Sequence, residues 1–126
     1  NELTNNFNYK RKFINILKNC DHELLIKIYD SHNIFILPSY TESYSQVVDE
    51  ALARGRPVII FKEIEDIVFA NRKGVFVANR NTDSLEGKIK YIIKNYYIIS
   101  KEINKTVLPS KAAFIKSLIK IIEKNI

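Results

Sequence analysis

Short apolar runs alternate along the chain with longer segments in which apolar residues recur at helical spacing. The runs are rich in β-branched and aromatic residues, as buried strands are. They occupy residues 12–17, 33–37, 56–61 and 74–79. The helical pattern occupies residues 21–32, 45–54, 82–94 and a segment from about 110 onward. Apolar strands that alternate with helices are typical of parallel βαβ units, so we expect an α/β fold with a Rossmann-like parallel sheet flanked by helices.

Single residues mark where these elements should begin and end. Asp21 has the side chain of an N-cap for the first helix. Pro38 cannot donate to a strand ladder and should end the second strand. Gly55 stands where the helix over 45–54 needs a left-handed residue after its last turn. In the last two helices we expect the following apolar residues to face the core: Leu85, Ile89, Ile92 and Ile93, then Phe114, Leu118 and Ile121 or Ile122.

The length and composition favour a single domain covering residues 1–126, because 46% of the residues are hydrophobic, enough for a core. No apolar run approaches the roughly 20 residues that a membrane-spanning helix needs. The lone Cys20 and the lack of a secretory signal favour a cytoplasmic location. The sequence has no methionine and begins at Asn1, so we expect it to be an excerpt from a longer polypeptide.

The net charge of +6 leaves three hypotheses open. The basic residues near the C-terminus recur at helical spacing, which favours a solvated helix face: Lys111, Lys116, Lys120 and Lys124. The second hypothesis is attraction to anionic lipid, with peripheral contact at the inner face of the membrane. The third is nucleic-acid binding, but no aromatic and basic motif supports it, so we expect no nucleic acid as partner.

Two carboxylates, Glu42 and Glu50, lie eight positions apart around the expected start of the helix over 45–54. The loop before this helix follows the second strand, and ligands of open α/β sheets bind beyond the carboxyl ends of strands. The helix N-terminus offers free N–H groups and a partial positive charge that suit a phosphate. Glu50 could then reach a ribose while Glu42 faces a transferred group. By spacing alone, Glu50 could equally pair with Arg54 as ordinary surface charge.

The stretch LPSYTESYSQVVDEALARGRPVII resembles the donor-binding segment of retaining GT-B glycosyltransferases of the group 1, or family 4, type. That family's pattern runs P-S-x-x-E-G-F-G-x-x-x-x-E-A-x-A-x-G-x-P-V-I. The matching residues are Pro38, Ser39, Glu42, Glu50, Ala51, Ala53, Gly55, Pro57, Val58 and Ile59. The likeness extends from about Lys12 to Lys94, with Asp66, Gly74 and Asp83 at further family positions.

The resemblance implies a donor-binding half of a GT-B fold. As part of a complete enzyme of hexosyltransferase type, this half would bind the nucleotide-sugar, and the enzyme would transfer the sugar to an acceptor with retention of configuration. By position, Glu42 would be catalytic and face the donor sugar, and Glu50 would bind the ribose hydroxyls. The loop residues Ser39, Ser43, Tyr44 and Ser45 would contact the donor's sugar or diphosphate. The resemblance implies no cofactor and no metal in this domain.

The sequence departs from the family pattern in two respects. Ser43, Tyr44 and Ser45 replace Gly-Phe-Gly, and serines restrict the close backbone approach that glycines allow. We also find no counterpart of the family's N-terminal acceptor domain or of the first strand and loop with its basic pair. We therefore expect a missing N-terminal domain or companion chain as partner, and an incomplete sheet with exposed edges. A truncated, non-catalytic module that binds a partner subunit is the alternative hypothesis.

Overall fold

The computed structural model describes residues 14–66, 72–105 and 111–124. Three parallel strands form one sheet in the order β1-β2-β3, namely β1 (Phe35–Leu37), β2 (Val58–Phe61) and β3 (Val75–Ala78). The helices are α1 (His22–Ser31), α2 (Gln46–Ala53), α3 (Thr82–Asn104) and α4 (Lys111–Lys124), with a 3₁₀ turn η2 (Lys62–Ile64) after β2. The expected α/β fold with a parallel sheet flanked by helices is confirmed.

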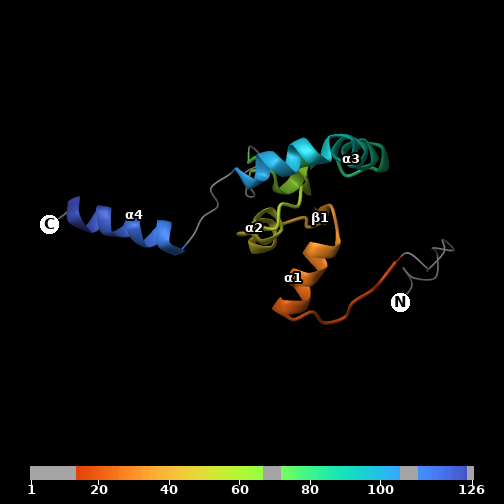
Figure 1. Ribbon diagram of the computed structural model, residues 1–126. Coiled ribbons are helices and arrows are strands. Elements are labelled where there is room, and N and C mark those ends of the chain that lie inside the picture. The colour runs from red at the N-terminus through yellow and green to blue at the C-terminus, as the bar shows by residue number, and fades with distance from the viewer. Residues whose placement is uncertain (1–13, 67–71, 106–110, 125–126) are drawn as a thin grey trace.

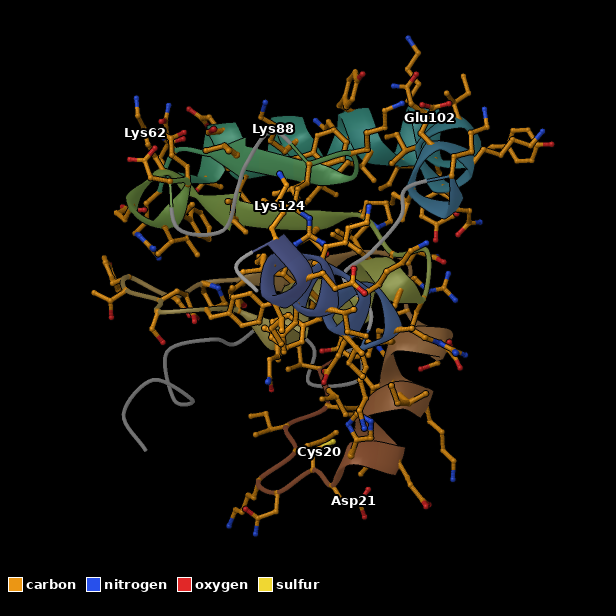
Figure 2. All side chains as sticks on the ribbon, turned by 90° about the vertical axis from the view of Figure 1, so that its left-hand side faces the viewer. Cys20, Asp21, Lys62, Lys88, Glu102 and Lys124 are labelled. Carbon is orange, nitrogen blue, oxygen red and sulfur yellow. The ribbon has the colours of Figure 1, made fainter. Side chains whose placement is uncertain are left out.

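The central strand β2 is buried on both faces, so its alternate residues enter two separate cores. Val58 and Ile60 pack with side chains of α2, including Val48 and Leu52. Ile59 and Phe61 pack on the other face with side chains from β3 and α3. Figure 2 shows α3 lying along the sheet from Lys88 to Glu102, with α1 and Asp21 at the opposite side of the molecule. The sheet therefore separates α2 from the first half of α3.

Local capping explains where the helices begin and end. The Asp21 side chain accepts a hydrogen bond from Leu24 N at 2.8 Å, as an N-cap does. After α2, Gly55 has φ +69 and its N–H bonds to Leu52 O, while Arg56 N–H bonds to Ala51 O. These two bonds form a Schellman motif, which requires a left-handed residue at this point. The predictions for Asp21 and Gly55 are confirmed.

The strand expected at the start of the chain is not present in the described part of it. Residues 14–17 have no regular structure, and Ile14, Ile16 and Leu17 are exposed. Lys12 and Phe13 lie outside the described residues. A strand forms only beside a partner, and residues 14–17 pair with none of the three described strands. Among the described residues nothing pairs with the outer edge of β1 or of β3, which is the incomplete sheet that we expected.

The two C-terminal helices differ from the sequence prediction. Helix α3 continues ten residues beyond Lys94, and it buries Ile92 and Ile103, whereas Ile93 is 64% exposed. Figure 1 shows α4 standing away from the sheet. Its expected inward face is exposed at Phe114, Leu118, Ile121 and Ile122. Helical spacing predicts which residues share a face, but not whether another element covers that face.

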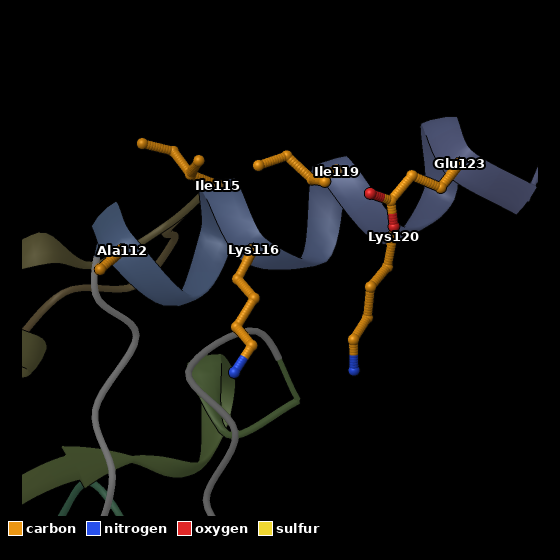
Figure 3. Close-up of a pocket in the computed structure, with 6 residues that line it drawn as sticks. All are labelled: Ala112, Ile115, Lys116, Ile119, Lys120 and Glu123. Carbon is orange, nitrogen blue, oxygen red and sulfur yellow. The ribbon is translucent and has the colours of Figure 1, made fainter.

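Helix α4 has one apolar and one basic face. Figure 3 shows Ile115 and Ile119 projecting from one side of the helix and two lysines from another. We call Lys116, Lys120 and Lys124 the lysine row, since they recur at every fourth position. A hollow of about 480 Å³ along α4 is lined by residues of that helix alone. None of the described helices has the length and apolar character to cross a membrane.

Candidate functional site

The loop that joins β1 to α2 lies at the carboxyl edge of the sheet, which Lys62 after β2 marks in Figure 2. The loop ends at Ser45, the N-cap residue of α2, whose backbone is extended. Ser45 is 7% exposed, and its hydroxyl oxygen has no hydrogen-bond partner among the described residues. A helix N-terminus also carries backbone N–H groups without intrahelical partners and a partial positive charge. Donors for an anion therefore gather at this point.

A shallow hollow of about 570 Å³ opens beside this helix start. Its lining residues come from β1, the loop and the first turn of α2: Leu37, Glu42, Tyr44, Ser45, Gln46 and Val47. Glu42 is half-buried and makes no hydrogen bond or ion pair with another described residue. Thus the structure places Glu42, Tyr44 and Ser45 together. Ser43 is exposed nearby, and the Ser39 carbonyl is engaged by an arginine described below.

Glu50 lies elsewhere, on the side of α2 that faces α1. It accepts a hydrogen bond from the Tyr29 hydroxyl at 3.4 Å, and His22 Nδ1 lies 3.9 Å from its other oxygen. Burial, reinforced by the Glu50 charge, raises the pKa of Tyr29 to about 12, so this hydroxyl is protonated and donates at neutral pH. The pairing with Arg54 does not form, because Arg54 Nε donates to Asp30 at 2.7 Å. Glu50 is therefore not among the residues that line the hollow containing Glu42.

Tyr44 is tied to the flank of α2 rather than free in the hollow. Its hydroxyl donates to the Asp49 carboxylate, which also accepts from Arg72. The hydrogen bond to Asp49 raises the pKa of Tyr44. The Asp49 and Arg72 side chains are only 20% and 23% exposed, so the pair is partly desolvated. This network gives the middle residue of the Ser-Tyr-Ser segment a fixed direction.

Arg80 is a residue of this edge that the sequence analysis missed. It follows β3 by two positions, and its Nη1 and Nη2 atoms donate to the carbonyls of Pro38 and Ser39 at 3.1 and 2.9 Å. Nε and Nη2 also donate to the two Glu63 oxygens at 3.1 and 3.3 Å. The sequence did contain a signal for Arg80, because it comes directly after an apolar run that predicts a strand. Residues at the carboxyl ends of parallel strands converge on one edge of the sheet.

No group of three or more His, Cys, Asp or Glu side chains within ranges 14–66, 72–105 and 111–124 is placed to hold a metal ion. The single cysteine, Cys20, is exposed and has no disulfide. The polar groups that the hollow offers to a ligand are backbone donors, the Tyr44 and Ser45 hydroxyls, the Gln46 amide and the Glu42 carboxylate.

A parallel sheet whose carboxyl edge carries a loop and a helix N-terminus has the ligand-binding arrangement of Rossmann-like α/β proteins. Within this class, the family model described as Glycosyl transferases group 1 matches residues 4–123, and the chain belongs to this family. The architecture is consistent with a Rossmann-like half of a GT-B fold. Family membership makes glycosyl transfer the general chemistry of this domain. No curated protein and no solved structure matches the chain.

Proposed function

We propose that the hollow at the start of α2 binds a nucleotide-sugar, and that the domain contributes this donor site to a retaining glycosyltransferase of hexosyltransferase type. The buried Ser45 hydroxyl carries the proposal, because it lies at a helix N-terminus and has no hydrogen-bond partner among the described residues. A donor diphosphate supplies the acceptor oxygens that this hydroxyl and the neighbouring N–H groups need. Tyr44 lines the same hollow, and its backbone N–H and that of the neighbouring Ser43 would donate to the diphosphate or sugar.

In this proposal Glu42 is the catalytic carboxylate. When the bond between the anomeric carbon and the diphosphate breaks, the electron pair leaves with the diphosphate and positive charge develops on the sugar. A carboxylate beside the sugar stabilises that charge, and donors at the helix N-terminus stabilise the leaving group. The acceptor hydroxyl forms the new bond to the anomeric carbon on the face from which the diphosphate departs, and its proton passes to an oxygen of that departing diphosphate. Glu42 is half-buried on the hollow and makes no ion pair with a described cation, so its charge is available.

We assign Glu50 to the ribose hydroxyls of the donor, which requires the donor to extend from the hollow past Val47 to the side of α2 that faces α1. Its carboxylate is about one quarter exposed, and both of its contacts with α1 are long, at 3.4 Å and 3.9 Å. A ribose hydroxyl can therefore bind the same carboxylate at a shorter distance without breaking a strong pair. Ser39 would line the sugar side of the loop.

Isothermal titration of the chain with UDP, GDP and ADP, and then with their hexose conjugates, tests the proposal. We expect at least one nucleotide to bind at millimolar concentration or below. Glu50→Gln should weaken the nucleoside diphosphate, whereas Glu42→Gln should alter only the binding of the sugar conjugate. Glu86→Gln is the matched control, because Glu86 lies on the solvent side of α3 in a pair with Lys90. Absence of heat with every nucleotide at millimolar concentration would contradict the donor site.

A second candidate function is a non-catalytic module that binds a partner subunit. The exposed apolar face of α4 favours it, because Phe114, Leu118 and Ile122 are 68%, 44% and 49% exposed. Analytical ultracentrifugation tests whether the apolar face associates, with Leu118→Glu as the disrupting variant and Lys116→Glu as the matched charge control on the opposite face. Association that only Leu118→Glu abolishes, together with no nucleotide binding, would favour this function over the first.

A further inference from the structure

Arg80 connects the ends of all three strands at the carboxyl edge of the sheet. It follows β3, contacts the first two residues after β1 through their carbonyls, and pairs with Glu63 after β2. Its guanidinium carbon lies 3.8 Å from the centre of the Tyr40 ring and 4.3 Å from that of Phe61. The loop between β1 and α2, which we call the donor loop after its proposed function, therefore begins with a segment, residues 38–40, that one side chain attaches to the rest of the sheet.

Four of the five N–H groups of the Arg80 guanidinium are engaged within the described chain. Nε and Nη1 make one hydrogen bond each and Nη2 makes two. The Arg80–Glu63 hydrogen bond lowers the pKa of Glu63, so its carboxylate is charged at neutral pH and balances the arginine. Because the charge and most of the donors are already used, Arg80 is placed to hold the loop rather than to bind a phosphate.

The loop itself has little else to fix it at this end. Residues 41–43 lie between the segment that Arg80 holds and Tyr44, whose hydroxyl donates to Asp49 of α2. Glu42, in the middle of that span, has no side-chain partner among the described residues. The position of its carboxylate relative to the hollow therefore depends on where the two ends of the span are held.

We propose that Arg80 is a positioning residue for the donor loop, fixing residues 38–40 so that Glu42 and the start of α2 keep the geometry of the hollow. The consequence for ligand affinity rests on the proposed donor function, whereas the consequence for loop order does not. A lysine cannot replace Arg80, because an ammonium group lacks the planar fork that reaches two carbonyls and a carboxylate at once.

The experiment compares wild type, Arg80→Gln, Arg80→Lys and Arg54→Gln. Arg54 is the matched control, since its fork also binds a carboxylate, that of Asp30, but at the far end of α2. Amide hydrogen exchange of residues 40–45 is measured without ligand, and nucleotide affinity is measured with UDP, GDP and ADP. We expect both Arg80 variants to speed exchange in this segment and to weaken nucleotide binding by about tenfold, because a loop that keeps the binding geometry only about a tenth of the time raises the apparent Kd by that factor. Arg54→Gln should leave both unchanged.

Unchanged exchange at residues 40–45 in Arg80→Gln would overturn the proposal, and so would the same increase in Arg54→Gln. If Arg80→Gln does not fold, Tyr40→Leu replaces it, because Tyr40 is 67% exposed and its loss removes one face of the contact without opening the core. Faster exchange of the loop in that variant supports the proposal, and unchanged exchange overturns it. Faster exchange in a chain whose wild type binds no nucleotide would leave Arg80 as the positioning residue and contradict the donor function alone.

Discussion

Gly74, the residue before β3, is the position at which a single added methyl group should cost most. Its φ of +88 is a conformation that side-chain-bearing residues rarely adopt. A Cβ placed there would lie 2.4 and 2.6 Å from Cγ1 and Cδ1 of Ile103, and 3.0 Å from Leu52 Cδ2. Both neighbours are 2% exposed. The Gly74 carbonyl also accepts the Val58 N–H at 2.8 Å, so the backbone cannot shift without loosening β2.

Two costs add in Gly74→Ala. Left-handed backbone at a residue with a Cβ costs about 1 to 2 kcal/mol. Forcing a methyl group into a filled core costs about 1 to 3 kcal/mol more. We expect the free energy of unfolding to fall by about 2 to 5 kcal/mol, a large part of the roughly 5 to 15 kcal/mol typical of a domain.

Urea unfolding followed by far-ultraviolet circular dichroism measures this loss. Gly87→Ala is the matched control, because nothing lies within 4 Å of a Cβ at this position of α3, and the better helix former should stabilise the chain by about 1 kcal/mol. Ile103→Ala removes both clashing atoms, so its cost and that of Gly74→Ala should combine to less than their sum. An unchanged urea midpoint in Gly74→Ala, or strict additivity in the double variant, would refute the steric argument.

Three further predictions concern the site and α4. Ser45→Ala should change the free energy of unfolding by less than about 0.5 kcal/mol, because the Ser45 hydroxyl makes no capping bond. Loss of an ordinary N-cap costs roughly 1 kcal/mol. A loss of that size in urea unfolding would contradict the absence of a capping bond. The folded-state pKa of Tyr29, about 12, lies above its unfolded value near 10, so its contribution to stability is complete below pH 10 and is lost as the pH rises to about 12. Unfolding measured across that range should therefore show a steeper decline for wild type than for Tyr29→Phe, and parallel curves would contradict the raised pKa. The lysine row predicts salt-sensitive association with anionic vesicles, to which each lysine near the surface contributes about 1 kcal/mol. Cosedimentation with these vesicles should be lost when all three lysines become glutamine. Equal binding to neutral vesicles would contradict this electrostatic attraction.

The sequence predicted those features that depend on near neighbours along the chain. Asp21 caps α1 through an N–H three residues away, and Gly55 ends α2 through bonds to the last turn of the same helix. The continuous apolar run of β2 predicted a strand that is buried on both faces, and all four of its residues are buried. The motif around Glu42 predicted a loop that leads into a helix start, and the structure has a helix start there.

Contacts between distant segments could not be predicted in the same way. Residues 14–17 have the composition of a strand but no partner among the described residues, and strand formation requires one. Glu50 faces Tyr29, 21 residues earlier, rather than the hollow that contains Glu42.

The sequence by itself determined the parallel α/β pattern, the helix caps and the family motif, because each of these features depends on residues that lie close together in the chain. Only the tertiary structure decided which faces are covered and which side chains hold the site. Arg80 lies 17 residues from Glu63 and 42 from Pro38, and the sheet brings all three to one edge. Pairing of the strands brings these three residues together in space, and no local pattern in the sequence predicts that contact.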